Sequence, residues 1–133
     1  AAENPCLALG YRRSSPQTTR HLGNAGYNVL DFGPERGWLA IDPKGLFGER
    51  GFDYAIMFLN PDLTAPYHRI AVDRGRFLRR LDLVAEAADL ERHRLLRWIL
   101  AWCGLSCVWS SHDDDAVSVA IEVARFAAAE LDL

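Results

Sequence analysis

Apolar residues recur at steps of three and four over the second half of the chain, and this period constrains the fold more than any other feature. It begins near Ala71 and runs in three stretches. The apolar positions are Phe77, Leu78, Leu81, Val84 and Ala88, then Leu95, Trp98, Ile99, Trp102, Leu105 and Trp109, and then Val117, Ala120, Ile121, Ala124, Ala127 and Ala128. Such spacing places apolar side chains on one face of an α-helix. We therefore expect three amphipathic helices.

Aspartates that precede two of these stretches predict where the helices begin. Asp89 stands before the second stretch, and Asp115 ends the polar break His112-Asp113-Asp114-Asp115 before the third. An Asp at the first position of a helix accepts hydrogen bonds from backbone N–H groups that have no partner inside the helix. We expect Asp89 and Asp115 to cap the second and third helices.

Two short apolar runs upstream of the helices predict a β-hairpin. Residues 29–32 and 38–41 are the runs, and Gly33-Pro34-Glu35-Arg36-Gly37 has the composition of a turn. If the loop is centred on Glu35, Gly33 faces Gly37, Val29 faces Ile41 and Asn28 faces Asp42. The next segment, 43–51, is rich in Gly and begins with Pro, so it is predicted to be a loop, and 52–59 is predicted to be a short buried helix.

The predicted neighbours Asn28 and Asp42 form a candidate metal site. An amide oxygen and a carboxylate on adjacent strands are hard ligands that suit Mg²⁺, which takes its remaining ligands from water and phosphate. The alternative is that Asn28 starts a strand and Asp42 begins a turn before Pro43, which are common roles for these residue types. Spacing alone favours the alternative.

Length and charge narrow the class of protein. The 133 residues suffice for one domain, and 15 basic against 18 acidic residues give a net charge of −3, which argues against nucleic acid as a partner. Three cysteines without a framework spacing indicate a cytoplasmic protein, and no apolar run is long enough to span a membrane. Residues 1–27 lack any sustained period, so we expect an irregular segment there and the folded part from residue 28 onward.

Several strings of the sequence resemble one enzyme family. They are Asn28-Val29-Leu30, Gly37-Trp38-Leu39-Ala40-Ile41-Asp42-Pro43-Lys44-Gly45-Leu46, Gly51-Phe52-Asp53, Arg79-Arg80-Leu81-Asp82, Arg94-Leu95-Leu96 and Leu105-Ser106-Cys107-Val108-Trp109-Ser110. They are similar to aminoglycoside phosphotransferases, most closely to the subgroup of streptomycin and hydroxyurea kinases. The resemblance implies the C-terminal lobe of a protein-kinase-like fold, of class α+β and mostly helical, with a small β-hairpin and about four helices.

The resemblance also assigns roles to individual residues. It implies that 28–60 hold a metal-binding hairpin and an activation-like loop and that 61–133 are a helical subdomain. Asn28 and Asp42 would hold the Mg²⁺ of bound ATP, which neutralises charge on the phosphates. Asp53 matches a structural position. Lys44 would contact a phosphate, although a solvated loop lysine is the more common situation.

The sequence departs from the family at the position of its catalytic Asp and in its length. Relatives place this Asp five residues before the metal Asn, where this chain has Gly23; His21 matches the family histidine, and Asn24 is a weak substitute for the Asp. The ATP-covering lobe with its phosphate-gripping Lys has no counterpart upstream of Asn28. The chain starts with Ala instead of Met, which is expected of a processed or incomplete sequence. From the missing lobe and the vacant base position we expect either a fragment of a longer kinase or a degenerate remnant.

Other candidate sites are weaker. Cys103 and Cys107, with His112 near, suggest a metal site but lack a fourth ligand, so buried thiols are the expected alternative. The run Asp113-Asp114-Asp115 would bind a cation or an aminoglycoside, or else form a solvated helix cap. Trp98, Trp102 and Trp109 are expected in the core, with a substrate wall as the alternative.

The sequence therefore leaves two functions open. The first is transfer of the ATP γ-phosphoryl group to an alcohol of a small molecule such as an aminoglycoside. The second is a non-catalytic helical binding module that forms a homodimer through apolar surface left by the missing lobe.

Overall fold

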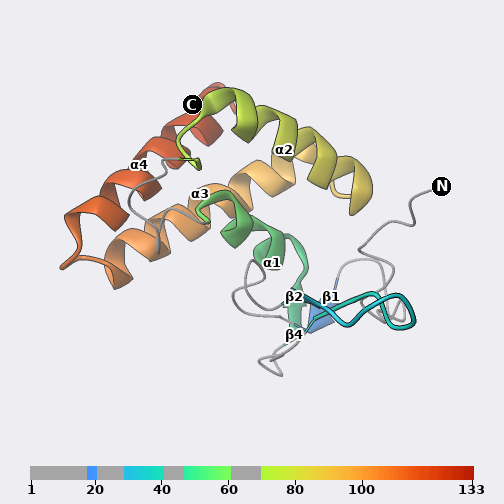
Figure 1. The fold of residues 1–133 in the computed structure, drawn as a ribbon. Helices are drawn as coiled ribbons and strands as arrows, with labels where there is room; N and C mark the ends of the chain where they lie inside the picture. The colour runs from blue at the N-terminus through green and yellow to red at the C-terminus, as the bar shows by residue number, and fades with distance from the viewer. Residues whose placement is uncertain (1–17, 21–28, 41–46, 61–69) are drawn as a thin grey trace.

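The described part of the chain contains two pairs of short strands followed by helices (Figure 1). The computed structural model describes residues 18–20, 29–40, 47–60 and 70–133. The strands are β1 (Thr18–Arg20), β2 (Val29–Asp31), β3 (Trp38–Ala40) and β4 (Phe47–Glu49). The helices are α1 (Gly51–Ala55), the 3₁₀ helix η1 (Ile56–Phe58), α2 (Arg74–Ala87), α3 (Arg92–Trp109) and α4 (Asp114–Ala129). The predicted mostly helical α+β class is confirmed over these residues.

Helix α3 is the central helix of the helical part, because α1, α2 and α4 all pack against it. In Figure 1, α3 runs back along α2 and α4 runs back along α3. The largest side chains that are fully buried are Phe58, Leu59, Leu81, Leu95, Leu96, Ile99, Val123 and Cys103. Full burial of one such aliphatic or aromatic side chain contributes about 1.5–3 kcal/mol to the free energy of unfolding. The three predicted apolar stripes thus meet in one core.

The caps of α3 and α4 each lie two residues away from the aspartates that were predicted to cap them. Asp89 does not cap α3: it has a φ of 50° just after α2, in the left-handed region that Asp tolerates better than most residues. The cap of α3 is Glu91, whose carboxylate accepts hydrogen bonds from the backbone N–H groups of His93 and Arg94. Likewise Asp113, and not Asp115, caps α4. Asp115 lies in the first turn, where a negative charge is favourable near the helix N-terminus.

Two strands form where the sequence predicted irregular structure. β4 lies inside the segment 43–51 that was predicted to be a loop, and β1 lies inside the irregular segment 1–27. The two strands pair antiparallel with each other, with Thr18 opposite Glu49 and Arg20 opposite Phe47. Each strand is three residues long, which is too short to show an alternating pattern in the sequence. Its hydrogen-bond partner is distant in sequence, so no local pattern predicts the pairing.

The short buried helix predicted for 52–59 is confirmed, as α1 followed by η1. Ala55, Phe58 and Leu59 on this segment are 0%, 1% and 0% exposed. Arg80 of α2 contacts the C-terminal end of this segment, because its Nη1 donates a hydrogen bond to the carbonyl oxygen of Met57 over 2.5 Å. None of the helices in the described ranges is long and apolar enough to cross a membrane.

Candidate functional site

Two strand ladders bring together the ends of the two segments that contain the predicted site. Segment 21–28 connects β1 to β2, and segment 41–46 connects β3 to β4. The residues at the first ends, Arg20 and Phe47, are partners in the β1–β4 ladder. The residues at the other ends, Val29 and Ala40, are partners in the β2–β3 ladder. Cα atoms of antiparallel partners are about 4.5–5.5 Å apart, so the described residues that flank the two segments lie beside each other in pairs.

The register of the β2–β3 hairpin differs from the predicted one by one residue. Val29 pairs with Ala40, where the sequence predicted Ile41. The turn closes between Phe32 and Gly37, because the Phe32 N–H donates to the Gly37 carbonyl oxygen over 2.8 Å. Gly33 and Gly37 have φ values of 85° and 65°, which glycine adopts without the steric cost of a Cβ. Residues 33–36 therefore form the loop, and its centre lies before Glu35.

The observed register does not support a metal pair that is formed by residues directly opposite each other in the hairpin. A shift by one residue exchanges the faces of a strand, so the observed ladder does not lead to Asn28 directly opposite Asp42. Both residues lie outside the described ranges, as do His21, Gly23, Asn24 and Lys44. Their roles remain predictions that rest on the resemblance and on the convergence of the segment ends.

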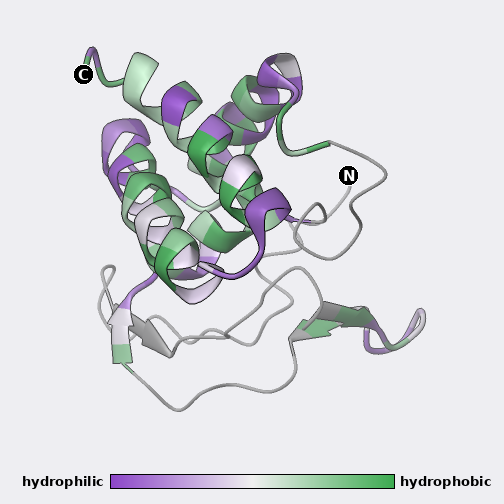
Figure 2. Ribbon diagram, turned by 90° about the vertical axis from the view of Figure 1, so that its left-hand side faces the viewer, coloured by the Kyte–Doolittle hydropathy of each residue, from purple (hydrophilic) through white to green (hydrophobic). Residues whose placement is uncertain are grey.

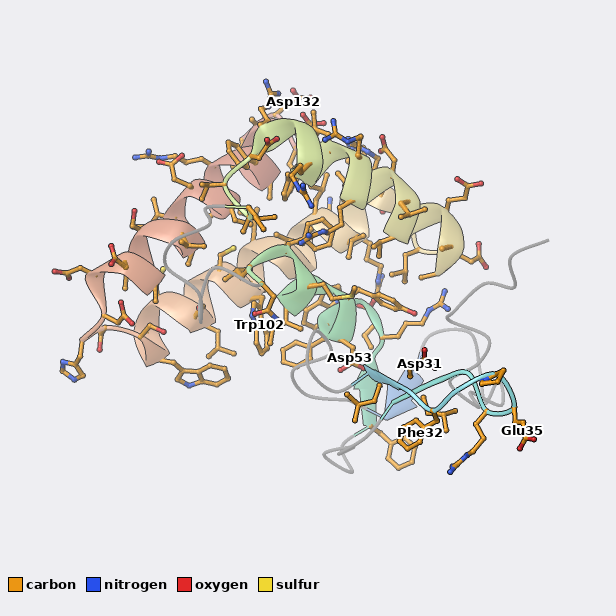
Figure 3. The ribbon with its side chains drawn as sticks, viewed as in Figure 1. Asp31, Phe32, Glu35, Asp53, Trp102 and Asp132 are labelled. Carbon is orange, nitrogen blue, oxygen red and sulfur yellow. The ribbon has the colours of Figure 1, made fainter. Side chains whose placement is uncertain are left out.

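Asp31 is the carboxylate of the described hairpin that lies closest in sequence to these segments. Its Oδ1 accepts a hydrogen bond from the Gly33 N–H over 2.8 Å, which holds the turn. Figure 3 shows Asp31, Phe32 and Glu35 along the hairpin, and Asp53 on α1 beside the strands. Asp31 therefore has a structural role in the turn.

Asp53 is 5% exposed and sits in the first turn of α1. Its backbone N–H donates to the Arg50 carbonyl oxygen over 3.1 Å. Helix α1 follows directly after β4 and packs on α3, so this carboxyl group is held between the strands and the helical core. Its burial agrees with the structural role that the resemblance implies.

Glu49, the last residue of β4, connects the strands to α3, and the sequence analysis did not single it out. Its Oε2 lies 3.0 Å from Nε of Arg94 and also accepts a hydrogen bond from the indole Nε1 of Trp98. Glu49 and Trp98 are 49 residues apart. Residues this far apart in sequence do not form a local motif, so the sequence alone does not predict the contact between Glu49 and Trp98.

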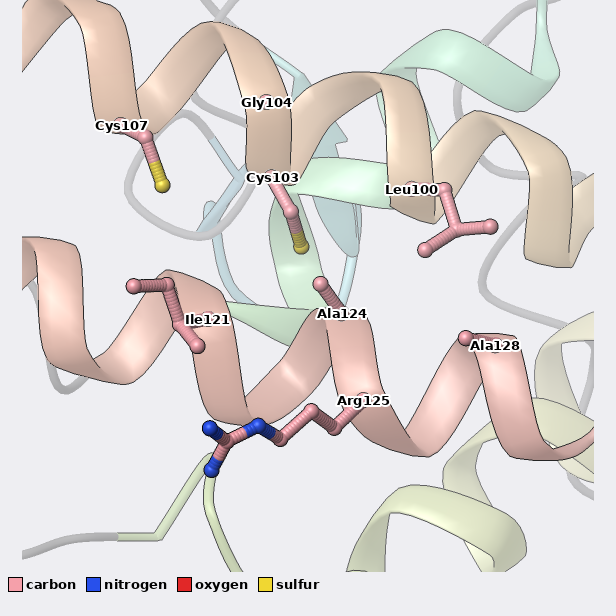
Figure 4. Close-up of a pocket in the computed structure, with 8 residues that line it drawn as sticks. All are labelled: Leu100, Cys103, Gly104, Cys107, Ile121, Ala124, Arg125 and Ala128. Atoms are coloured by element: carbon pink, nitrogen blue, oxygen red, sulfur yellow. The ribbon is translucent and has the colours of Figure 1, made fainter. Parts of the chain in front are cut away.

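The cysteines face a groove between α3 and α4, shown in Figure 4. The groove has a volume of about 360 Å³, and Cys103, Cys107 and Ile121 are among its lining residues. Burial raises the pKa of the Cys103 thiol to about 12, and the nearby Cys107 adds to the rise. No group of three or more His, Cys, Asp or Glu residues that would hold a metal ion occurs in the described part of the chain. Cys103 belongs to the core, as the alternative to a metal site predicted.

The other weak candidates also have structural roles. Asp113 accepts a hydrogen bond from the Ala116 N–H over 3.0 Å, so the acidic run forms a helix cap. Trp102 is buried and contacts Phe52 with ring centroids 4.7 Å apart. Trp98 is half-buried beside the same ring. The expectation that Trp109 lies in the core is wrong, because 65% of it is exposed near the end of α3.

Comparison with known protein families shows to which family the chain belongs. The family described as aminoglycoside/hydroxyurea antibiotic resistance kinase matches residues 14–114, which is more than half of the sequence. The chain belongs to this kinase family. The match begins inside the segment 1–27 that was set apart as irregular, and so includes β1 together with the segment that carries Gly23 and Asn28.

Individual members of the kinase family are similar over part of their length. A streptomycin 3''-kinase of Klebsiella pneumoniae is 58% identical over 82 residues, which are 62% of this chain and 30% of that kinase. A streptomycin 6-kinase of Streptomyces griseus is 39% identical over 79 residues, 57% of this chain and 24% of the relative. A hydroxyurea phosphotransferase of Kitasatospora aureofaciens is 34% identical over 104 residues, 78% of this chain and 26% of the relative.

The chain therefore spans between 24% and 30% of the length of these family members. The comparison with solved structures gives no significant match. Family membership is therefore shown by sequence similarity alone. The pairing of the strands that flank segments 21–28 and 41–46 is a feature of the structure.

Proposed function

We propose that the chain is part of a phosphotransferase that moves the γ-phosphoryl group of ATP to an alcohol group of a small molecule such as streptomycin. Family membership supports this proposal, as do the names of the relatives, which are streptomycin kinases and a hydroxyurea phosphotransferase. Within such an enzyme the chain would correspond to the C-terminal lobe of a protein-kinase-like fold. The β2–β3 hairpin would face the nucleotide, and helices α2–α4 would form the part of the lobe farther from it.

Asn28 and Asp42 would hold Mg²⁺ together with the phosphates of ATP. The observation that carries this assignment is the pair of ladders, because Arg20 pairs with Phe47 and Val29 pairs with Ala40. The described residues that flank the two segments with the predicted ligands are thus partners in the two ladders. An amide oxygen and a carboxylate are hard donors of the kind Mg²⁺ prefers. The bound ion would neutralise negative charge on the transferring phosphoryl group.

The residues of this chain would contribute positioning more than proton transfer. Segment 21–28 contains no carboxylate, and Gly23 stands at the family's catalytic position. Asp31 lies downstream of Asn28 at the end of β2, where its Oδ1 accepts a hydrogen bond from the Gly33 N–H and holds the turn. Asn24 would orient the attacked hydroxyl by a hydrogen bond but cannot accept its proton. Phosphoryl transfer depends mainly on alignment and charge neutralisation, so we expect a slow reaction and not a complete loss.

Lys44 would contact a phosphate of the nucleotide from segment 41–46. It is the sole lysine of the chain and follows Asp42 by two residues. Its ammonium group would reinforce the charge neutralisation supplied by the metal ion. The remaining phosphate contacts would come from parts of a longer kinase.

Calorimetric titration of Mg²⁺-ATP into the full chain tests the site. We expect measurable heat that EDTA abolishes, and an affinity at least tenfold lower for Asp42→Asn, because the change removes an anionic oxygen ligand. Asp115→Asn is the matched control, since Asp115 is exposed in the first turn of α4 and distant in sequence from both segments. Absence of heat with the wild type, or equal affinity for Asp42→Asn, would contradict the proposal.

Exposed apolar side chains on the strands support a second candidate function, a homodimerising module. Leu30 and Phe32 are 44% and 42% exposed, and Phe47 of β4 is 68% exposed. Figure 2 shows hydrophobic residues along the β2–β3 hairpin, which lies apart from the helices. Apolar surface of this kind commonly marks an interaction site. Its occupant would be a second copy of the chain or the remainder of a longer kinase.

A further inference from the structure

We propose that Cys103 and Cys107 form a two-thiolate site for a soft monovalent metal ion of the class of Cu⁺ and Ag⁺, in the groove between α3 and α4. The site is independent of the proposed phosphotransferase function, because both ligands lie on α3 and neither is a predicted ligand of Mg²⁺-ATP. Such a site needs two sulfur atoms at a suitable separation, surroundings without competing oxygen ligands, and access from solvent.

The two sulfur atoms have the spacing that one ion requires. Cys103 and Cys107 lie one turn apart on α3. Side chains four residues apart on a helix share one face and have Cβ atoms about 5–6 Å apart. Figure 4 shows both sulfur atoms directed into the groove, toward α4. Two bonds of about 2.3 Å, the length of a zinc–thiolate bond, span about 4.6 Å in a line, so a single ion fits between the sulfurs.

The lining of the groove favours a soft ion over a hard one. Apart from the two cysteines, the groove is lined by Arg125 and by residues whose side chains are aliphatic or absent, as in Gly104. These lining residues supply no carboxylate, carboxamide or imidazole to the groove. Thiolates select soft ions such as Cu⁺, whereas Mg²⁺ and Ca²⁺ take oxygen ligands.

The number of ligands excludes a structural zinc ion and admits an ion of low coordination number. Structural Zn²⁺ takes four ligands, and the described ranges contain no group of three or more His, Cys, Asp or Glu residues placed to hold a metal ion. A soft monovalent ion is satisfied by two sulfur atoms in a line. The donor set in the groove therefore fits this class of ion.

Cys107 provides the access to the site. Cys103 is 1% exposed, whereas Cys107 is partly exposed in the same groove of about 360 Å³. The ion binds Cys107 first, and its second bond, to Cys103, then forms within one molecule and gains from the high effective concentration. Two S–H bonds break, two metal–sulfur bonds form and two protons pass to the buffer. No electrons are transferred, so the step needs no oxidant or reductant.

Titration of Ag⁺ into the full chain carrying Cys6→Ser tests the site. This substitution removes the third thiol of the sequence and keeps both thiols of α3, so it serves as the reference. We expect one tightly bound Ag⁺ per chain, and native mass spectrometry to show that this ion displaces two protons. A reference chain that binds no Ag⁺, or that loses one proton for each ion bound, would overturn the two-thiolate site.

Substitution of either ligand separates a two-thiolate site from a single reactive cysteine. In the Cys6→Ser chain, we expect both Cys107→Ser and Cys103→Ala to weaken Ag⁺ binding roughly a hundredfold, because the second, intramolecular bond is lost. Cys107→Ser keeps the core intact, since Cys107 is partly exposed, and so covers the case in which Cys103→Ala disturbs folding. Val108→Ser is the matched control on α3, because Val108 is 71% exposed beside Cys107.

We expect Val108→Ser to bind Ag⁺ as the reference chain does, and circular dichroism to show the same helix content for Cys107→Ser, Val108→Ser and the reference. Equal Ag⁺ affinity for Cys107→Ser and the reference would refute the proposal. Binding of Zn²⁺ as tight as that of Ag⁺ would also refute it, since structural Zn²⁺ requires further ligands.

Discussion

Two cysteines one helical turn apart show how strongly burial separates residues of the same type. Both side chains line the groove between α3 and α4, but Cys103 is 1% exposed whereas Cys107 is partly exposed. Burial raises the pKa of the Cys103 thiol to about 12, because its thiolate would lose contact with water. The nucleophilic form of a cysteine is the thiolate, so Cys103 is protected both by its proton and by the surrounding core.

We therefore expect Cys107 to react with iodoacetamide at pH 8 at least tenfold faster than Cys103 in the folded protein. Mass spectrometry of digested samples, taken over time, measures the two rates. The same reaction in urea is the control, since both thiols are then exposed and their rates should converge. Equal rates in the native protein would contradict the described packing of α3 on α4.

At the scale of the elements, Glu130 joins three helices through two arginines. Glu130 directly follows α4, and its carboxylate contacts Arg92 of α3 at 2.8 Å and Arg74 of α2 at 3.2 Å. The hydrogen bond from Arg92 is the main cause that lowers the pKa of Glu130 below its usual value. A carboxyl group whose pKa is lower in the folded state stabilises the fold above its unfolded pKa, and the effect disappears as pH falls through the folded pKa.

We expect Glu130→Gln to lower the free energy of unfolding at pH 7 by about 0.5–1 kcal/mol, the range for partly exposed ion pairs. The difference from the wild type should shrink as the pH falls through the lowered pKa of the Glu130 carboxyl group, where the wild-type carboxylate takes up its proton. Urea unfolding followed by circular dichroism at pH 7 and pH 3 measures both values. A difference that grows on acidification would show that the contact does not stabilise the fold as an ion pair.

At the scale of the whole molecule, the helices share one core while the strands present apolar side chains outward. Phe47 is 68% exposed on β4, and Leu30 and Phe32 are exposed on and just after β2. Phe32 also lies beneath the Arg36 guanidinium, which is 5.0 Å from the ring centroid. Burial of such side chains between two copies would remove apolar surface from water, at about 25 cal/mol per Å².

We expect the chain to sediment as a dimer at high concentration, and Phe47→Ser to shift the equilibrium toward monomer. Leu133→Ser is the control, because Leu133 is 84% exposed at the end of the chain and distant in sequence from the strands. Analytical ultracentrifugation over a concentration series measures the association. A wild type that stays monomeric throughout would remove the support for the dimerising module.

Local patterns predicted the helices better than the strands. Phe77, Leu81 and Val84 recur with the period of a helix and lie buried on α2, because amphipathic spacing depends only on near neighbours. The hairpin was also predicted, but its register was displaced, since the conformations of Gly33 and Gly37 decide how many residues the turn contains. The candidate ligands Asn28 and Asp42 came from family resemblance, and their geometry stays a prediction.

The sequence by itself determined three amphipathic helices, a hairpin and membership of the kinase family, because each depends on residue types at short and regular separations. Only the tertiary structure decided that β1 pairs with β4 and that Glu49 anchors this ribbon to Trp98 and Arg94. Those contacts join residues that are 27 to 49 positions apart, as in Arg20 with Phe47 and Glu49 with Trp98. Pairing over such separations depends on the folding of the chain between the partners, which no local pattern encodes.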